Sequence, residues 1–380
     1  MIIFFSIFFS LYFAINYYIF IRGWESLAIF PQLRIIYLII FSIFCFSYII
    51  AKFLEKRLPG FLYDFFLKIG SYWFAVMLYT FLTILLIDIV RILNYFLHFI
   101  PNFVYDNYNN TKFILGLAIV IITTVIIILG FLNTKKIRIK TLNLTIARKK
   151  SSFQNLNAVL VSDIHLSPLN DEKFSSTIVK KINELNPDIV FIAGDIVDDN
   201  AKTLTARNIG VSLKNITAKH GVFVCTGNHE FINGIKGCEE YIRNLSFNLL
   251  RDKTYLLKEG LLIVGRDDSS MKSFDGKSRK SLEEIMMNES KDYPVILLDH
   301  TPFKLEQAEK NNIDLQLSGH THHGQLFPLN FITSMIYEKS RGYLKKVNTQ
   351  YYVSCGVGTW GPRVRTGSIS EIINLKLEFV

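Results

Sequence analysis

The sequence predicts two parts, a region of four membrane-spanning helices over residues 1–132 and an α/β domain of packed sheets over residues 153–380. Three observations support this fold class. Long apolar runs without charge crowd the first part, and such runs are typical of helices that cross a bilayer. In the second part, short β-branched runs alternate with amphipathic stretches, which is typical of α/β folds. Small groups of Asp, Asn, His and Gly follow several of these short runs, where a sheet can gather ligands at one edge.

Four apolar runs are each predicted to span the membrane, at residues 1–21, 35–51, 71–90 and 113–132. Buried helices of a soluble domain are the alternative, but four such runs leave too little polar surface to cover them. The first run could also be a signal peptide. It has neither a basic start nor a small-residue cleavage site, and further spans follow it, so we predict a span there.

Asp88 is the one acid inside a predicted span, and Arg91 follows it by one helical turn. An acid within the bilayer can mark an ion or proton path. The spacing of three residues favours a simpler interpretation, an ion pair at a helix end near the interface. We therefore predict no transport function.

The distribution of Lys and Arg predicts the orientation of the spans, because these residues favour cytoplasmic loops. The loops after the first and third spans are poor in them, whereas the second loop and the segment after the fourth span are rich. This pattern predicts an integral, multi-pass membrane protein whose N-terminus and C-terminal domain are both cytoplasmic. The poor loops hold Arg22, Arg34, Arg91 and Lys112, and the rich segments hold Lys52, Lys56, Arg57, Lys68, Lys135, Lys136, Arg138, Lys140, Arg148, Lys149 and Lys150.

Residues 133–152 are predicted to form a basic linker between the two parts. The formal net charge of +10 could suggest a nucleic-acid partner. However, the basic residues cluster beside the apolar runs, which suits anionic lipid headgroups better. We therefore expect a membrane partner and no nucleic acid. The four cysteines show no paired spacing, so we expect no disulfide framework.

The C-terminal domain is predicted to begin with a strand over residues 158–162. A helix over residues 172–183 follows, because Phe174, Ile178 and Ile182 recur every four residues. Later runs rich in β-branched residues predict the remaining strands. These strands cover residues 189–193, 222–225, 261–264, 295–298, 315–318, 351–354 and 372–379.

Polar clusters follow five of the predicted strands, in the order D-x-H, G-D, G-N-H-E, a lone His, and G-H-x-H. This ordered set resembles the calcineurin-like metallophosphoesterases, in particular a membrane-associated branch of that family. The resemblance covers roughly residues 157–380 and implies an αββα sandwich of two mixed sheets. The clusters are Asp163-Ile164-His165, Gly194-Asp195, Gly227-Asn228-His229-Glu230, Asp299-His300 and Gly319-His320-Thr321-His322.

The resemblance implies a site for two divalent metal ions, in which a hydroxide bridging the two metals attacks phosphorus. Ligation by both imidazole and oxygen suits Mn, Fe, Zn or Co better than Ca or a purely Mg site. Glycines at positions 194, 227 and 319 are expected to let the backbone turn sharply beside the ligands. By resemblance, Asp163, His165, Asp195 and His322 hold one ion, and Asp195, Asn228, His300 and His320 hold the other, with Asp195 bridging.

The resemblance gives His229 a role apart from the ligands, that of donating a proton to the leaving oxygen or steadying the transition state. Asp198 is expected to orient His229, as the equivalent acid does in related protein phosphatases. Those phosphatases continue with Arg-Gly, whereas Asp199-Asn200 follows here. This departure argues against a protein phosphatase and leaves the role of Asp198 open.

These features predict a membrane-anchored, metal-dependent phosphoester hydrolase that acts on a phospholipid or a lipid-linked diphosphate. One alternative is a phosphodiesterase or phosphatase for a soluble substrate that is merely tethered to the membrane. Another is a non-catalytic scaffold that retains the fold. A nucleic-acid exonuclease is disfavoured because the basic residues lie beside the membrane spans. The motifs do not separate monoesterases from diesterases.

Several further polar residues have a structural interpretation. His220 is expected at the surface, and Asp267-Asp268 is expected to cap a turn. His323 is expected behind the ligands or exposed. The glycines at 356 and 358 are expected to form a tight turn near the metals, and Arg363 and Arg365 either contact a substrate phosphate or form an exposed salt bridge.

Overall fold

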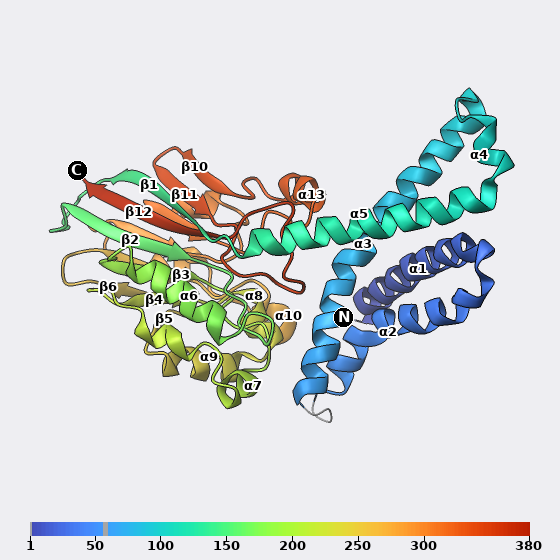
Figure 1. The fold of residues 1–380 in the computed structure, drawn as a ribbon. Helices are drawn as coiled ribbons and strands as arrows, with labels where there is room; N and C mark the ends of the chain where they lie inside the picture. The colour runs from blue at the N-terminus through green and yellow to red at the C-terminus, as the bar shows by residue number, and fades with distance from the viewer. Residues whose placement is uncertain (1, 56–59) are drawn as a thin grey trace. The chain divides into compact units, whose positions relative to one another are not determined.

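The computed structural model describes residues 2–55 and 60–380, and the chain divides into two compact units. The first unit comprises residues 1–131 together with 361–364, and the second comprises residues 132–360 together with 365–380. Figure 1 shows the helices of the first unit in blue to teal and the strands of the second in green to red.

Long apolar helices make up the first unit. Among the described residues, three segments are long and apolar enough to cross a membrane, Pro31–Phe53, Gly60–Leu97 and Tyr108–Thr134. They contain three of the predicted spans. The span predicted at residues 1–21 falls on a helix that begins at Ile2, and residue 1 lies outside the described residues, so the count of four remains a prediction. The helices are α1 (Ile2–Ser26), α2 (Arg34–Phe53), α3 (Gly60–Leu97), α4 (Asn102–Asp106) and α5 (Tyr108–Thr134), with 3₁₀ turns at Leu27–Ile29 and Pro31–Leu33.

Asp88 lies within α3 and forms the predicted ion pair with Arg91, at 3.1 Å between Oδ1 and the guanidinium. Two residues of α1, Tyr18 and Arg22, also contact its other carboxylate oxygen. The contacts from α1 could not be read from local spacing. Two of the residues used for the orientation, Lys56 and Arg57, lie outside the described residues, and the cytoplasmic orientation remains a prediction.

The second unit contains two six-stranded mixed sheets in the described part of the chain. The first sheet has the order β1-β12-β2-β3-β4-β5, in which β2 to β5 are parallel and β12 runs antiparallel to β2. The second has the order β10-β11-β9-β8-β7-β6, in which β11, β9, β8 and β7 are parallel. The strands are β1 (Arg138–Ile146), β2 (Asn155–Val161), β3 (Ile189–Ala193), β4 (Val222–Cys225), β5 (Asn248–Leu249), β6 (Lys253–Leu256), β7 (Leu262–Gly265), β8 (Val295–Leu298), β9 (Leu315–Ser318), β10 (Gly342–Lys346), β11 (Thr349–Val353) and β12 (Glu371–Phe379).

Helices lie between the strands in sequence, and several of them cover the outer faces of the sheets. The predicted helix over residues 172–183 is α6, which the side chain of Asp171 caps by accepting a hydrogen bond from the Phe174 N–H. The helices are α6 (Glu172–Asn183), α7 (Ala201–Ala206), α8 (Asn228–Ile232), α9 (Ile235–Asn244), α10 (Met271–Phe274), α11 (Leu282–Met286), α12 (Glu306–Lys310) and α13 (Leu329–Ile336), with a 3₁₀ turn at Val211–Asn215.

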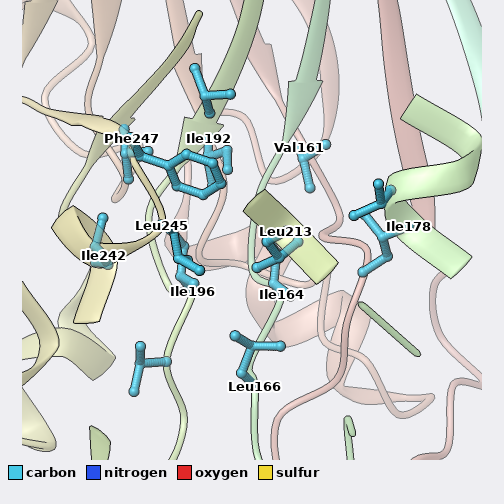
Figure 2. Packing of buried hydrophobic residues seen from close by; sticks show 14 of the residues in the cluster. Val161, Ile164, Leu166, Ile178, Ile192, Ile196, Leu213, Ile242, Leu245 and Phe247 are labelled. Atoms are coloured by element: carbon cyan, nitrogen blue, oxygen red, sulfur yellow. The ribbon is translucent and has the colours of Figure 1, made fainter. Parts of the chain in front are cut away.

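Three buried clusters define four layers. In β3, Ile189, Phe191 and Ala193 face the apolar layer between the two sheets, whereas Val190 and Ile192 face the layer under α6 and α9. Figure 2 shows that outer layer, where Ile178 of α6 and Ile242 of α9 pack over Val161 and Ile192 of the sheet. A third cluster places α11 and α12 on the second sheet. The arrangement is the αββα sandwich that the resemblance implies.

The predicted basic linker over residues 133–152 contains a strand. Residues 138–146 form β1, which pairs in parallel with β12 along its full length and becomes the edge of the first sheet. Most of its side chains are exposed, because an outer strand buries little surface. Its second half nevertheless alternates, because Leu142, Leu144 and Ile146 are more buried than the residues between them. This period of two is typical of a half-buried strand, but the basic residues on either side of it favoured the interpretation as a linker.

Candidate metal centre

The predicted ligands lie just beyond the carboxyl ends of five strands. Asp163, Asp195 and Asn228 follow β2, β3 and β4, which are parallel neighbours in the first sheet. His300 and His320 follow β8 and β9, which are parallel neighbours in the second. The carboxyl ends of parallel strands meet at one edge of a sheet, where such folds gather ligands.

One group of buried side chains joins Asp163, His165 and His322. The Nε2 atoms of His165 and His322 are 2.9 Å apart, and His322 Nε2 lies 3.5 Å from Asp163 Oδ1. Asp163 Oδ2 is buried and has no hydrogen-bond partner among the described residues. A buried carboxylate oxygen without a partner is costly, and two imidazole nitrogens that face one another suit a shared cation.

A second group joins Asp195, Asn228, His300 and His320. Asp195 Oδ2 lies 3.1 Å from His300 Nε2 and 3.7 Å from His165 Nε2 in the first group. Asn228 Oδ1 lies 2.8 Å from His320 Nδ1 and 3.2 Å from His300 Nε2. Asp195 thus stands between the two groups, which is the position that the resemblance implies for a bridging ligand.

The tautomer of His300 also suits a ligand. Its Nδ1 lies 2.7 Å from the carbonyl oxygen of Ala193, so Nδ1–H donates there and Nε2 is left to ligate. Although burial lowers the pKa of His300, Asp195 raises it above its ordinary value. A cation held between these two residues would take the place of that proton. The donor set of imidazole, carboxylate and amide oxygen therefore fits divalent transition metals.

The backbone at these ligands is strained. Asp163, His165, Asp195, His320 and His322 all have positive φ, between 44° and 70°. Non-glycine residues in the left-handed region cost on the order of 1–3 kcal/mol each and gather at functional sites. The strain therefore supports a functional role for this edge of the sandwich.

Two of the three predicted turn glycines act through close approach instead. Gly194 has φ +79°, as expected of a sharp turn, whereas Gly227 and Gly319 lie outside the left-handed region. A Cβ at 227 would lie against the Asp195 carboxylate, and a Cβ at 319 would lie against Asp163. These two glycines therefore leave room for the ligands rather than turning the chain.

His229 contacts Asp198, which is the pairing that the resemblance predicts. Its Nδ1 lies 2.6 Å from Asp198 Oδ1, and its side chain is 21% exposed, so part of the ring is accessible to solvent. Although burial opposes the charge, Asp195 and Asp198 raise the pKa of His229 to about 9. Burial likewise opposes ionisation of Asp198, but His229 and His165 hold the pKa of that carboxyl well below its ordinary value.

Glu230 has a structural role that the sequence motif did not disclose. Its buried carboxylate accepts hydrogen bonds from the backbone N–H groups of Gly227, Asp195, Ile196 and Val197, at 2.7 to 3.1 Å. It thus ties the loop after β4 to the loop after β3. The only sequence feature that pointed to Glu230 was its position in the G-N-H-E cluster. That position identifies the residue but does not indicate which groups it contacts.

Arg365 is completely buried, so neither predicted role, a contact with substrate or an exposed salt bridge, applies to it. Its guanidinium donates to the carbonyl oxygens of Cys355 at 2.8 Å and Ile369 at 3.1 Å, and to Ser368 Oγ at 2.7 Å. It also lies 3.1 Å from His322 Nδ1. Arg365 therefore braces a predicted ligand and the C-terminal loop. Arg363 is half-buried.

The remaining polar residues have packing or hydrogen-bond partners. His220 is less exposed than expected, because its ring packs at 5.3 Å on Phe153. His323 is buried, and its Nδ1 lies 3.0 Å from Ser340 Oγ. Asp267 accepts from Thr226 and Arg251, and Asp268 accepts from Thr301 and from the Ser270 N–H.

Comparisons with known proteins show the family to which the chain is similar. Residues 156–324 match the family described as calcineurin-like phosphoesterase. The chain is 31% identical over 276 residues to an uncharacterised metallophosphoesterase of Campylobacter jejuni, and the match covers 70% of each chain. It is 31% identical over 271 residues to the transmembrane protein with metallophosphoesterase domain of Danio rerio, covering 68% of this chain and 61% of that one.

A more distant relative has a named reaction. The chain is 26% identical over 301 residues to the UDP-2,3-diacylglucosamine pyrophosphatase of Chlamydia trachomatis, covering 63% of this chain and 89% of that protein. Alignments to two uncharacterised metallophosphoesterases of Helicobacter pylori cover 59% of this chain and 60% of each relative's length. The match therefore spans less than two thirds of several relatives.

Proposed function

Because this chain belongs to the calcineurin-like metallophosphoesterases, a family of hydrolases acting on phosphoester bonds, we propose that it is a membrane-anchored, metal-dependent phosphoester hydrolase. The observation that carries the proposal is the pair of ligand groups on either side of Asp195. A scaffold without activity would have no need of both groups, of a buried carboxylate oxygen without a hydrogen-bond partner among the described residues, or of five strained ligands.

The chain would hold one ion with Asp163, His165, Asp195 and His322, and a second with Asp195, Asn228, His300 and His320. When bound, such a pair of divalent ions supplies an activated water and neutralises charge on the phosphoryl group. Asn228 contributes a neutral oxygen, which limits the negative charge that faces an anionic substrate.

His229 is proposed as the proton donor to the leaving oxygen. Asp195 and Asp198 raise the pKa of His229 to about 9, which favours the protonated form that a proton donor requires. Asp198 holds Nδ1 at 2.6 Å, so the ring presents Nε2–H away from Asp198. A positioned acid of this kind contributes roughly 10²–10⁴-fold to the rate.

The substrate is proposed to be a lipid phosphoester or a lipid-linked diphosphate. Two facts support this choice, the three helices able to span a membrane and a relative named for a pyrophosphatase reaction on a diacylated sugar nucleotide. A soluble substrate handled by a tethered domain is the alternative. We also propose that the catalytic domain is cytoplasmic, and a reporter fused after Val380 that signals an external location would reject that orientation.

Hydrolysis by the purified full-length protein tests the reaction class. A panel of nitrophenyl monoesters and diesters is assayed with added Mn²⁺, and again after exhaustive chelation and after Mn²⁺ is restored. We expect turnover that chelation abolishes and Mn²⁺ restores. Turnover that survives chelation would reject the metal-dependent mechanism, and no turnover with Mn²⁺, Fe²⁺, Zn²⁺ or Co²⁺ would favour the scaffold.

A further inference from the structure

Helix α13 is an apolar helix that follows directly after the ligand loop containing His320 and His322. None of its residues, all within the described part of the chain, is buried. Phe331 is 60% exposed, Ile332 49%, Met335 78% and Ile336 55%. Residues four apart lie on the same side of a helix, so these four side chains form one exposed face.

Two further aromatic side chains extend this face. Phe327 is 49% exposed and packs at 5.8 Å against Phe331, and Phe303 is 46% exposed. Single exposed apolar residues are ordinary, but a contiguous group of this kind marks a site of interaction. We call the set of Phe303, Phe327, Phe331, Ile332, Met335 and Ile336 the apolar lip.

The apolar lip is fixed to the metal centre. Tyr337, the residue after α13, packs against Phe303 at 4.7 Å and against the ring of His320 at 5.9 Å. The ligand loop is also bound to the segment after α13, because Thr321 Oγ1 donates to the Ser340 carbonyl at 2.6 Å. An apolar group held on the lip would therefore keep a constant distance from the ligands.

Basic residues follow the lip in sequence. Lys339 is half-buried, and Arg341 and Lys345 are exposed. An apolar helix followed in sequence by basic residues is typical of segments that contact lipids, since the cations attract anionic headgroups. The same chain carries helices able to span a membrane. Lipid is therefore an apolar partner that is present wherever the protein is anchored.

We propose that the apolar lip is the acyl-chain subsite of the phosphoesterase, binding the hydrocarbon part of a lipid phosphoester while its phosphate reaches the metal centre. The inference rests on the proposed function and adds to it the residues that select the substrate. A second copy of the chain docked on the lip is the competing occupant.

Two substrates that differ only in chain length test the proposal, methyl 4-nitrophenyl phosphate and dodecyl 4-nitrophenyl phosphate. They share the reacting diester and the leaving group. With full-length protein and Mn²⁺, we expect kcat/KM to favour the dodecyl ester at least tenfold, equivalent to about 1.4 kcal/mol. The double variant Phe331→Ser with Met335→Ser should lose this preference and keep the methyl ester rate within about twofold, because both side chains are exposed and their loss removes only apolar contact area.

A matched control replaces Met287, which is 71% exposed, and Val347, which is 78% exposed, with serine. This pair should retain the dodecyl preference. A preference that survives in the lip variant, or that never exists in the parent, overturns the proposal. A lip variant that changes from dimer to monomer while keeping its preference also overturns it, in favour of the second copy.

A binding measurement makes the outcome independent of turnover. The four cysteines, all within the described residues, are buried, so a fluorophore can be attached selectively to Met335→Cys, with Met287→Cys as its control. We expect saturable spectral shifts on adding dodecyl phosphate at position 335 alone, and none with inorganic phosphate. Binding without turnover of any ester would reject the proposed function but keep the subsite, whereas turnover without this shift would reject the subsite alone.

Discussion

Replacing Glu230 with glutamine should destabilise the catalytic domain and weaken its metal affinity together. Oε1 of Glu230 accepts from Ile196 and Val197, and Oε2 accepts from Asp195 and Gly227. A glutamine keeps one acceptor oxygen, so its amide NH₂ would face two backbone N–H groups that have no other acceptor among the described residues. Each buried donor left unsatisfied costs about 1–3 kcal/mol, which gives a loss of about 2–6 kcal/mol.

Relief of the repulsion between Glu230 and Asp195 offsets part of this loss, so the lower half of that range is expected. A change of 1 kcal/mol shifts the Tm of a domain of this size by about 2–4 °C, and we expect a decrease of at least about 4 °C. Because the tied loops carry Asp195 and Asn228, Mn²⁺ affinity should also fall, by roughly 10–100-fold as for other residues that orient ligands.

Thermal denaturation of the full-length protein in detergent and calorimetric Mn²⁺ titration would measure both effects. Glu240→Gln is the matched control, since Glu240 is an exposed glutamate on α9, and it should change neither quantity. A Glu230→Gln protein with unchanged Tm and unchanged Mn²⁺ affinity would refute the positioning role. A lower Tm with full metal affinity would show that the four hydrogen bonds stabilise the fold without orienting ligands.

Three further substitutions distinguish the metal ligands from residues that act beside them. Asp195→Asn should abolish turnover and reduce the Mn²⁺ bound per chain, because Asp195 contacts both ligand groups; full occupancy by metal analysis would contradict its bridging position. His229→Asn should retain both ions and slow kcat roughly 10²–10⁴-fold, with a smaller effect on good leaving groups, and loss of metal would show that His229 is a ligand. Arg365→Lys should lower both Tm and Mn²⁺ affinity with KM nearly unchanged, because the guanidinium contacts His322 and main-chain carbonyls; a raised KM with normal Tm would instead indicate contact with substrate phosphate.

The strands that the sequence predicted and those that it missed differ in their place in the sheets. The predicted strands correspond to β2, β3, β4, β7, β8, β9, β11 and β12, which occupy the interior of the sheets. The missed strands are β1, β5, β6 and β10, the outer strands of both sheets. In β6 most side chains are exposed, so the hydrophobic signal on which the prediction depends is weak there. In β1 the alternating Leu142, Leu144 and Ile146 lie between basic residues, which favoured the interpretation as a linker. Pairing with a neighbour, rather than burial, holds these segments in place.

The residues of the site also differ in whether the sequence could predict their roles. Residues that lie next to a strand end in a short motif, such as Asp163 and Asn228, could be placed from the sequence because the parallel strands bring their ends together. The roles of Glu230 and Arg365 depend on contacts with distant segments, at residues 195–197 for Glu230 and at His322 for Arg365. No spacing rule connects those positions, so the residue types were visible but their partners were not.

Glu230 and Arg365 are both buried charged residues that hydrogen-bond to the main chain beside the predicted ligands, one as an acceptor and the other as a donor. The carboxylate of Glu230 accepts hydrogen bonds from backbone N–H groups of the loops after β3 and β4. The guanidinium of Arg365 donates hydrogen bonds to backbone carbonyls of the C-terminal loop beside His322. Five predicted ligands have a left-handed backbone, and that conformation persists only where surrounding contacts fix it. Charged side chains bonded to the main chain supply such contacts more strongly than neutral ones. The geometry of the centre is therefore set by the chain itself, which is why we expect changes at either residue to alter stability and metal affinity together.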